Sequence, residues 1–534
     1  MIRDDLLGAV HAALATLGVA DVPDAVVIER PARPEHGDWS TNAALVCSKV
    51  LGKNPREIGQ ALADELSANP PAHVEAVEIA GPGFVNFRLA NTWLYDVLAD
   101  VVAGGVDGFA RTESGRGLRV NVEFVSANPT GPLHAGHGRW AAYGDSLCRI
   151  LARCGYEPHA ETYVNDRGVQ IQHYADSLAA RKRGETPPDD GYMGAYITEW
   201  AGEMPDGADP VAWGMAYALE DQKQALGAMH VAFDTWSSER ESVDAGHMTS
   251  ALERLQAAGH VYEEDGAIWL RTTDFGDDKD RVLIKSDGDM TYLLPDIGYH
   301  ESKYERGDLL IDILGADHHG YVPRMKAALQ LLGHPADSYE AIIGQNVKLM
   351  RNGEEVKLSK RTGTIIELRE LVDDVGPDVA RFAYLMQSID TSLVLDIDLL
   401  RQESSENPVF YVQYAHARIH SIGRMAAERG IERKPLADAD LSLLQHEREL
   451  QLLRELFSLE DVLVASCAER APHKISSWVR ELASAFQGFY HDCPVLRDDV
   501  DPELQQARLW LVEATRIGLS IGLDLLGVHA PEQM

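Results

Sequence analysis

Cysteine is scarce in this sequence, and its cysteines do not form closely spaced pairs. The five among 534 residues are Cys47, Cys148, Cys154, Cys467 and Cys493, with no Cys-x-x-Cys motif. Disulfide scaffolds and structural zinc sites both need cysteines at short, repeated spacings. The sequence therefore argues against both, and we expect a cytoplasmic protein.

Long apolar runs are also missing. No stretch approaches the length of a membrane span, and the first five residues (Met-Ile-Arg-Asp-Asp) do not begin a signal peptide. Hydrophobic residues make up 45% of the chain and charged residues 25%, as in ordinary globular proteins. We expect no association with a membrane, and the length predicts about three or four domains.

Positive charge is in deficit. The chain has 49 lysines and arginines against 84 aspartates and glutamates, a formal net charge of −35. Nucleic-acid-binding proteins are usually basic on the contact face, so composition alone favours an enzyme that acts on small molecules. A locally basic groove is still compatible with this charge. The strongest candidate is the segment 348–361, whereas the basic run at 181–183 can equally be a solvated helix end.

The first 112 residues read as a separate α+β module. Apolar residues recur at helical spacing until the chain reaches Gly18. Residues 83–89 alternate between apolar and polar side chains, which predicts a strand. A link rich in glycine and aspartate at 104–108 closes the module.

The next segment opens like a doubly wound sheet. Val120, Val122 and Phe124 share one face of a predicted strand at 118–124. A loop then leads into an amphipathic helix that ends at Gly155. Ligands of such sheets bind beyond the carboxyl ends of the strands, so we expect a site in this loop.

The rest of the chain completes this pattern. A second buried strand is predicted at 309–314, and polar residues follow it at 315–320. Residues 185–262 are less regular and contain Pro- and Gly-rich turns, so we interpret them as an insertion between the two halves of the sheet. From residue 401 onward the apolar spacing is helical.

Two short motifs about 220 residues apart carry the most specific signal. The first is residues 134–137 (His-Ala-Gly-His), at the predicted start of a helix. His134 and His137 can donate hydrogen bonds to phosphate oxygens, because a helix N-terminus favours anions. Gly136 lets a flat ring approach the backbone, since a side chain would intrude. The alternative is an ordinary turn before a helix.

The second motif is residues 357–361 (Lys-Leu-Ser-Lys-Arg). Lys357 and Lys360 can hold the leaving phosphates of a nucleotide as point charges. The alternative is an exposed basic loop, which is common in proteins.

In this order, the two motifs resemble the ATP signatures of the class I aminoacyl-tRNA synthetases. Residues 126–133 (Ser-Ala-Asn-Pro-Thr-Gly-Pro-Leu), 163–166 (Tyr-Val-Asn-Asp) and 411–418 (Tyr-Val-Gln-Tyr-Ala-His-Ala-Arg) resemble the arginyl-tRNA synthetase version. Some arginyl-tRNA synthetases lack the second lysine of the loop and carry a lysine three residues before the first histidine. Gly131 stands there in this chain and Lys360 is present, so the sequence is similar to the branch with the complete loop.

The resemblance covers nearly the whole chain and implies an α/β multidomain fold. Residues 1–112 would form a module that binds the elbow of tRNA. Residues 113–400 would form a Rossmann-like class I catalytic domain that contains the insertion at 185–262. Residues 401–534 would form an all-α anticodon-binding domain.

The resemblance also implies a reaction and its partners. ATP would activate L-arginine as arginyl-adenylate, and the arginyl group would then move to the 2′-hydroxyl of the terminal adenosine of the arginine tRNA. Activation would need bound tRNA. Mg²⁺ would arrive with ATP, without a tightly bound cofactor and without a metal site of the protein's own. We expect a monomer.

For arginine itself, Tyr292 and Asp296 match the family's Tyr-x-x-x-Asp motif. A forked carboxylate suits a guanidinium, and Pro295 restricts this pair to an irregular or N-terminal helical turn. Asn128 resembles the family residue that helps hold the amino-acid end of the substrate, and Glu239 is a further carboxylate partner. The alternatives are a helix-capping role for Asp296 and a solvated surface position for Glu239.

The polar segment after the second strand is predicted to lie near the ATP ribose. Its adjacent histidines, His318 and His319, would point to opposite faces of an extended segment, so we reject a zinc site. The residues predicted for ATP binding and catalysis are His134, Gly136, His137, Gly315, Asp317, His319, Val347, Lys357, Ser359 and Lys360.

Five residues are candidates for tRNA contact. Phe84 and Asn86 stand where the family's N-terminal module reads the D-loop, and an aromatic ring beside an amide suits a flipped-out base. Tyr411, Tyr414 and Met534 resemble family residues near the anticodon. The alternatives are a core position for Phe84, helix-packing roles for the tyrosines and a loose tail.

Three other functions stay open at this stage. A different class I synthetase would need other substrate carboxylates than Asp296. A small-molecule nucleotidylyltransferase would not need the additional domains. A non-catalytic tRNA-binding relative would be expected to lose His134, His137 or Lys360, and all three are present.

Overall fold

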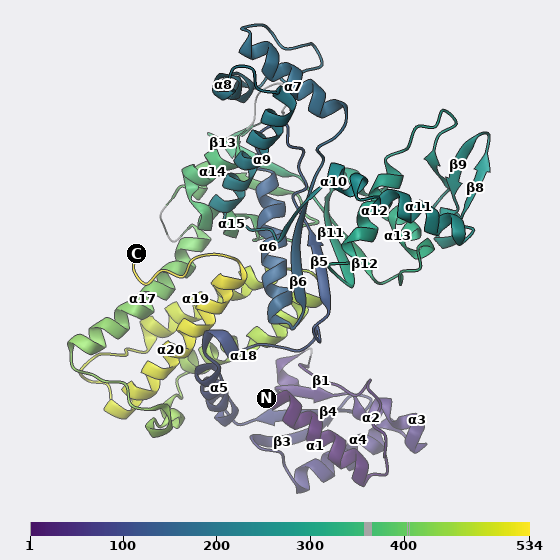
Figure 1. The fold of residues 1–534 in the computed structure, drawn as a ribbon. Coiled ribbons are helices and arrows are strands. Elements are labelled where there is room, and N and C mark those ends of the chain that lie inside the picture. The colour runs from purple at the N-terminus through teal and green to yellow at the C-terminus, as the bar shows by residue number, and fades with distance from the viewer. Residues whose placement is uncertain (1, 32, 357–365, 403, 405) are drawn as a thin grey trace. The chain divides into compact units, whose positions relative to one another are not determined.

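The computed structural model describes the whole chain except residues 1, 32, 357–365, 403 and 405 (Figure 1). The chain forms two compact units. The first contains residues 1–109, 422–457 and 485–517, and the second contains residues 110–421, 458–484 and 518–534. None of the helices in the described part of the chain has the length and apolar character that a membrane crossing needs.

The first unit contains a four-stranded antiparallel sheet with helices packed on it. The strand order is β1 (Ile28–Glu29), β2 (Trp39–Thr41), β4 (Phe84–Leu89) and β3 (Val74–Ala80). The helices of this part are α1 (Ile2–Thr16), α2 (Ala43–Val46), α3 (Ser48–Leu51), α4 (Pro55–Ala68) and α5 (Thr92–Gly108). The helix predicted before Gly18 and the strand predicted at 83–89 are confirmed.

Local signals explain where two of these helices begin and end. Helix α4 begins after Asn54, whose side chain accepts a hydrogen bond from the backbone of Arg56, and Pro55 occupies its first turn. Residues 104–108, expected as a link, instead form the end of α5. That helix is interrupted at Gly105, which has φ of +59°.

Four long helices form the C-terminal region, and each contributes to both units. They are α17 (Pro408–Glu428), α18 (Glu447–Ala468), α19 (His473–Asp492) and α20 (Pro502–Leu525). Within the first unit, Phe457 of α18 lies edge-on to Trp39 and Trp93, with ring centroids 6.1 and 4.7 Å apart. The helical character predicted from residue 401 onward is confirmed.

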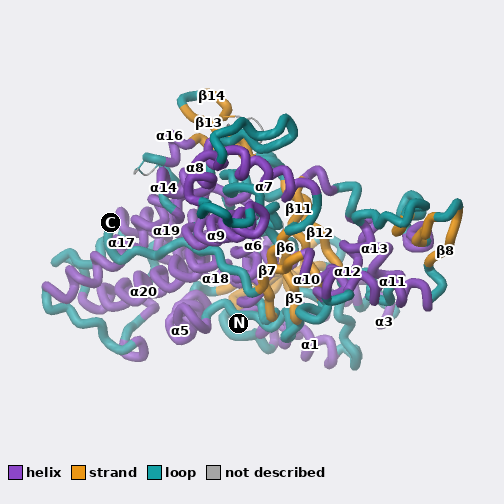
Figure 2. The backbone as a smooth tube through the Cα atoms, turned by 45° about the horizontal axis from the view of Figure 1, so that its top comes forward, coloured by secondary structure: helices purple, strands orange, loops and turns teal. Residues whose placement is uncertain are grey.

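A five-stranded parallel sheet forms the centre of the second unit (Figure 2). Its strand order is β12 (Tyr339–Gly344), β11 (Leu309–Gly315), β5 (Arg119–Glu123), β6 (Glu157–Val164) and β7 (Thr235–Ser238). Strand β5 comes first in the chain and lies in the middle, so the order reverses between β5 and β11. Helix α6 (His137–Arg153) connects β5 to β6. The strands predicted at 118–124 and 309–314 and the helix that ends before Gly155 are confirmed.

The structure differs from the sequence interpretation within residues 185–262. Helices α8 (Ala195–Glu203) and α9 (Pro210–Ala228) lie in this range, and together with α7 (Val169–Lys182), which precedes it, they form a regular helical layer after β6. Strand β7 lies in the same sequence range, yet it pairs in parallel with β6 and belongs to the core sheet. Its sequence, Thr-Trp-Ser-Ser, is short and mostly polar, so it lacks the apolar run that marked the other strands.

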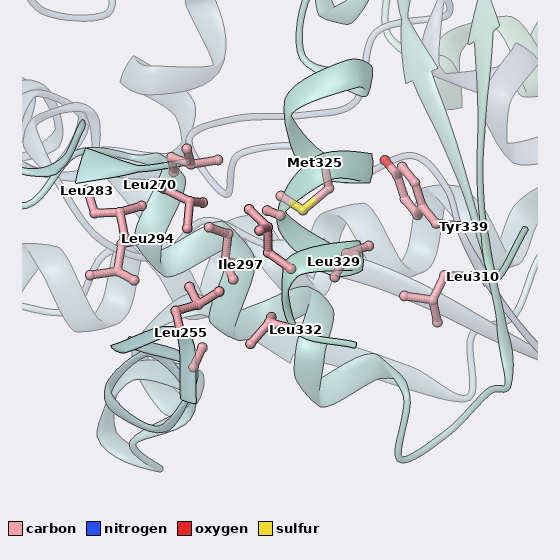
Figure 3. Close-up of a cluster of buried hydrophobic side chains, with 14 residues drawn as sticks. Leu255, Leu270, Leu283, Leu294, Ile297, Leu310, Met325, Leu329, Leu332 and Tyr339 are labelled. Atoms are coloured by element: carbon pink, nitrogen blue, oxygen red, sulfur yellow. The ribbon is translucent and has the colours of Figure 1, made fainter. Parts of the chain in front are cut away.

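A second hydrophobic core lies beside the sheet (Figure 3). Helices α11 (His247–Ala257), α12 (Leu293–Lys303) and α13 (Val322–Leu331) contribute Leu255, Ile297 and Leu329 to it. A small antiparallel sheet precedes α12 and consists of β8 (Val261–Glu264), β9 (Ala267–Leu270) and β10 (Arg281–Ile284). Helix α10 (Glu239–Asp244) follows β7 directly. Leu310 of β11 and Tyr339 of β12 belong to the same core, which therefore packs α12 against these two strands.

The remaining elements of the second unit follow β12 in the sequence and precede the long helices. Strand β13 (Val347–Arg351) pairs with β14 (Glu354–Val356) on one side and with β15 (Leu393–Asp396) on the other. The helices here are α14 (Leu368–Val375), α15 (Pro377–Tyr384) and α16 (Ile397–Leu400). Arg381 of α15 is buried, and its guanidinium pairs with Asp145 of α6 and donates to the carbonyl oxygen of Met229 at 2.8 Å. These bonds attach α15 to the core of the unit.

Candidate active site

A cavity of about 830 Å³ opens at the carboxyl ends of β5, β6 and β11. This is the edge where the strand order reverses, and ligands of doubly wound sheets bind there. Its lining includes Asn128, His134, His137, Asp296 and Gly315 from the predicted set. Two sequence-distant motifs, the histidine pair and the Tyr-x-x-x-Asp segment, thus contribute to one cavity.

A buried lysine lies beneath this cavity. Nζ of Lys303 lies 2.6 Å from Oε2 of Glu123 and 2.5 Å from Oδ1 of Asp312. Nε2 of His300 lies 2.8 Å from the other oxygen of Asp312. Burial opposes the ionisation of Asp312, but the charges of Lys303 and His300 outweigh it and hold the pKa of Asp312 well below its usual range. Asp312 is therefore ionised and paired.

A second buried carboxylate has its own arginine. Arg306 binds Glu161 of β6 through two hydrogen bonds of 2.8 and 2.9 Å. The Tyr299 hydroxyl bridges Glu161 and Glu123 at 3.0 and 2.9 Å. Burial opposes ionisation here too, but the Arg306 hydrogen bond and the Lys303 charge lower the pKa of Glu161 to about 2. Glu161 is thus ionised and paired with Arg306 in low-dielectric surroundings.

The histidine motif begins helix α6 at one side of the cavity. Gly136 is the residue before the helix, and the rings of His134 and His137 stack with centroids 3.8 Å apart. The backbone N–H of His134 donates to Nδ1 of His137 at 3.2 Å. Both rings line the cavity at a helix N-terminus, where the helix dipole favours negative charge.

The second motif falls outside the described residues. Lys357, Ser359 and Lys360 all lie in the range 357–365. The chain that follows is described, and it pairs with the first motif through backbone hydrogen bonds. Ala135 donates to Ile366 at 2.9 Å, and Leu368 donates to Leu133 at 2.7 Å. The segment directly after the lysine motif therefore lies beside the histidine motif.

Asp296 has the properties expected of a ligand for a cation. It lies in the first turn of α12 with Pro295, as predicted, and it lines the cavity. The residue that caps the helix is Tyr292, so the alternative of a capping role for Asp296 is wrong. Burial raises the pKa of Asp296 to about 6, although His300 and a hydrogen bond from Tyr321 lower it. This carboxylate lacks a basic side chain paired with it at salt-bridge distance among the described residues.

The other residues that were predicted to bind the substrate arginine lie around an adjoining cavity. This cavity has a volume of about 550 Å³ and is lined by Glu239 and Tyr292, while Asn128 lines both cavities. Burial raises the pKa of Glu239, so it is not a freely solvated surface carboxylate. The ring of Tyr292 is 91% exposed. The structure thus brings Asn128 and Asp296 into the main cavity and leaves the other two residues in the adjoining one.

The predicted ATP-ribose residues are only partly in the cavity. Gly315 and Asp317 line it, whereas His319 and Val347 are not among its lining residues. The residues one position earlier, His318 and Asn346, line it instead. No cluster of three His, Cys, Asp or Glu side chains suited to a metal ion occurs among the residues that the structure describes.

Sequence reasoning missed several side chains of the site. Tyr163, Tyr299, His300 and Tyr321 line the cavity, and Lys303 binds its lining residue Glu123. A signal existed: Asp296, Tyr299, His300 and Lys303 recur at spacings of three, one and three along one helix, which places polar groups on its inward face.

The five predicted tRNA residues belong to both units. In the first unit, Phe84 and Asn86 lie on the face of β4 opposite buried Val85 and Phe87, and Phe84 is half-buried there. Asn86 is only 4% exposed, and its amide has no hydrogen-bond partner within the described ranges.

The other three tRNA candidates lie in the second unit. The Tyr414 ring is half exposed, and the Arg418 guanidinium lies 4.5 Å from its centroid. Tyr411 lies one turn earlier on α17, and Met534 is exposed at the C-terminus.

Comparison with known proteins identifies related sequences along the whole chain. Residues 4–89 match the arginyl tRNA synthetase N terminal domain, residues 208–402 match the catalytic domain of class I tRNA synthetases of the arginine type, and residues 412–534 match the DALR anticodon binding domain. The arginine–tRNA ligase of Frankia alni is 46% identical over the full length of both chains.

Solved structures agree with these matches. A putative arginyl-tRNA synthetase from Campylobacter jejuni is 35% identical, with a TM-score of 0.75, and covers 84% of this chain and 100% of its own. The Thermus thermophilus arginyl-tRNA synthetase shares the fold over 100% of both chains, with a TM-score of 0.77 and 24% identity. The histidine motif at a helix N-terminus, the carboxylate of α12 beside it and the full-length identity lead to one conclusion: the chain belongs to the arginyl-tRNA synthetase family of the class I aminoacyl-tRNA synthetases.

Proposed function

We propose that this protein is an arginine–tRNA ligase that works in two steps. In the first, a carboxylate oxygen of L-arginine attacks the α-phosphate of ATP, and pyrophosphate leaves. In the second, the 2′-hydroxyl of the terminal adenosine of tRNA attacks the carbonyl of arginyl-adenylate, and AMP leaves with the bonding electrons. The observation that carries this proposal is the half-buried carboxylate of Asp296, which has no basic side chain at salt-bridge distance among the described residues and lines the same cavity as His134 and His137.

The arginine guanidinium is assigned to Asp296 and Glu239. Two carboxylates and the Tyr292 hydroxyl can accept the N–H donors of a guanidinium, and the positive charge that pairs with the carboxylates is one that a neutral amino acid lacks. Asn128 receives the amino-acid end of the substrate, and its own side-chain N–H₂ donates to Gln170 at 2.7 Å. Closure of the Tyr292 ring over the substrate would join the two adjoining cavities into one site.

ATP is assigned to the opposite side of the cavity. His134 and His137 donate to the phosphates, and Gly136 leaves room for the adenine ring. Gly315, Asp317, His319 and Val347 are proposed around the ribose and base, with His318 and Asn346 as direct neighbours. Lys357, Ser359 and Lys360 stabilise the leaving pyrophosphate.

Mg²⁺ enters as part of the ATP substrate. Phosphate oxygens and water suit this cation, which needs few dedicated protein ligands. Asp317 is the one predicted ATP-site residue with a carboxylate that lines this side of the cavity among the described residues.

The chemistry needs positioning more than covalent help from the protein. The fixed floor of paired carboxylates holds α12, so Asp296 is in place before the substrate binds. Donors at the N-terminus of α6 meet charge that develops on the leaving phosphates. Both effects favour the transition state without a side-chain nucleophile.

Transfer RNA is assigned to both ends of the chain. Residues 1–112 bind the tRNA elbow through Phe84 and Asn86, residues 113–400 catalyse both steps, and residues 401–534 bind the anticodon through Tyr411, Tyr414 and Met534. Phe84 and Asn86 lie two residues apart on one face of β4, so one base could contact both, which supports the first assignment. We also propose that activation requires bound tRNA, and that the protein is a cytoplasmic monomer.

The test is ATP–pyrophosphate exchange with each of the twenty amino acids, with and without arginine tRNA. The proposal predicts exchange with arginine alone and only in the presence of tRNA. Exchange with another amino acid would identify a different class I synthetase. Exchange without any amino acid would favour a nucleotidylyltransferase.

A further inference from the structure

Helix α9 donates side-chain hydrogen bonds to the loop that precedes the histidine motif. Gln222 of α9 is 2% exposed, and its side-chain N–H₂ donates to two carbonyl oxygens of this loop. The acceptors are Asn128 at 3.1 Å and Gly131 at 3.0 Å. Both N–H groups of one buried amide are therefore used on the loop, although the contacts join residues more than 90 positions apart in sequence.

Helix α8 donates a hydrogen bond to the same loop, at a carbonyl oxygen that lies between those of Asn128 and Gly131 in the sequence. The Tyr196 hydroxyl donates to the carbonyl oxygen of Thr130 at 2.9 Å. Gly131 packs against the Tyr196 ring, because a Cβ atom at Gly131 would lie 2.8 Å from it. The φ of Gly131 is +154°, which residues with a side chain rarely adopt, so both the backbone conformation and the close approach require glycine here.

These hydrogen bonds from α8 and α9 help to fix the position of Asn128. Within the loop, residues 128–131 pair with no strand among the described residues, and their one internal backbone bond joins Thr130 to Asn128 at 2.8 Å. Three side-chain bonds from α8 and α9 hold its carbonyl oxygens from behind, and Asn128 faces both cavities in front. Without those donors the loop would lose partners for buried carbonyl groups and would relax.

Asp221, the residue before Gln222, forms an ion pair with the segment that follows the lysine motif. Oδ1 of Asp221 lies 3.2 Å from the guanidinium of Arg369 in α14. Arg369 follows the stretch 366–368 that pairs with the histidine motif. Successive residues of one helix thus hold the two segments that flank the ATP motifs.

We propose that α9 is a positioning element for the active site, in which Gln222 orients Asn128 toward arginine and Asp221 orients the segment 366–369 toward ATP. Neither side chain touches substrate. The inference rests on the proposed function, because it assigns arginine to Asn128 and ATP to the paired segments. It gives the helical layer between β6 and β7 a role in catalysis, in addition to its role in packing.

The test compares the contacts of α8 and α9 with the loop before the histidine motif and the contact of Asp221 with Arg369. It measures the KM values for arginine and ATP in the full-length enzyme at saturating tRNA. Gln222→Met keeps the size of the side chain and removes both donors, and Tyr196→Phe removes the third. Each single variant should raise the KM for arginine and leave the KM for ATP within about twofold of the wild-type value. The double variant should lose about 10- to 100-fold in kcat/KM for arginine. Asp221→Leu should show the opposite pattern, with the defect in ATP.

Glu220→Gln, an exposed change on the same helix, is the matched control and should behave as wild type. Thermal unfolding and tRNA binding of each variant show whether the fold is kept. Equal changes in both KM values, or no change in Gln222→Met and Tyr196→Phe, would overturn the proposal. If Gln222→Met does not fold, Tyr196→Phe alone decides. An inactive wild-type enzyme would instead contradict the proposed function.

Discussion

The ammonium group of Lys303 lies 2.5 Å from the carboxylate of Asp312, and both side chains are buried beneath the cavity. The pair connects α12, which carries Asp296, to β11, the strand beside the point where the sheet order reverses. Burial lowers the pKa of Lys303, but Asp312 and Glu123 outweigh it and leave that pKa raised. The ion pair therefore persists across the pH range in which the enzyme would work.

Lys303→Met is expected to destabilise the protein strongly. It leaves Asp312 and Glu123 buried without their cation, and breaking a buried pair in this way costs about 3–5 kcal/mol. Urea unfolding monitored by tryptophan fluorescence measures the change. Arg119→Met, which breaks the exposed pair with Asp308, is the control and should have no measurable effect. Equal stability of Lys303→Met and wild type would show that the pair is not structurally important.

The pH dependence of arginine use should follow Asp296. Its pKa is raised to about 6 by burial, so the free enzyme carries the charged form above that pH. A guanidinium binds only the charged carboxylate, so kcat/KM for arginine should be constant above about pH 6 and fall about tenfold per unit below it. A profile for arginine that stays flat to pH 5 would contradict this role.

Protein stability should respond to the same group with the opposite sign. A carboxyl group whose folded-state pKa lies above its unfolded value binds protons more tightly in the folded state. Its contribution therefore increases as the pH falls through about 6, where arginine binding is lost. Urea unfolding of wild type and Asp296→Asn between pH 5 and pH 7 isolates this contribution, which the variant should lack.

Lys360→Ala should impair adenylate formation and leave tRNA binding nearly intact. Loss of one preorganised contact to a leaving group costs about 10²–10³ in rate. Single-turnover activation with saturating tRNA measures it. Lys348→Ala is a suitable control, because Lys348 is exposed on β13 and pairs only loosely with Glu355, at 3.7 Å. Activation within a few-fold of wild type would show that Lys360 does not hold pyrophosphate.

Asn86→Ala should raise the KM for tRNA and leave the KM values for arginine and ATP almost unchanged. The amide has no partner in the described part of the protein, so a base edge would be its first; losing one base contact costs about 1–3 kcal/mol. The defect should shrink at saturating tRNA. Asn69→Ala, at an exposed helix end in the same unit, is the control. A defect that persists at saturation would indicate a structural role for Asn86.

The sequence predicted the elements whose signals are local. Alternating apolar residues at 118–124 and the helical stripe that ends before Gly155 identified β5 and α6, and Pro295 correctly limited Asp296 to a first helical turn. The short polar strand β7 was missed, because its place in the sheet depends on pairing with β6.

Long-range contacts explain what else stayed hidden. Lys303 reads as an ordinary surface lysine in sequence, and its burial follows from Glu123, which lies 180 residues away. Gln222 likewise has no local signal, since both of its acceptors lie in a loop before α6. Such residues are specified by the assembled fold, and neither periodicity nor motif reveals them.

The most direct test of the account is the effect of Asp296→Asn on the two small substrates. The variant keeps the shape of the side chain and replaces an ionic, forked contact with a neutral one, so arginine binding should weaken much more than ATP binding. Steady-state charging of arginine tRNA gives both KM values. A large rise in the KM for arginine with a nearly unchanged KM for ATP is the predicted result, and comparable changes in both would contradict arginine recognition by Asp296.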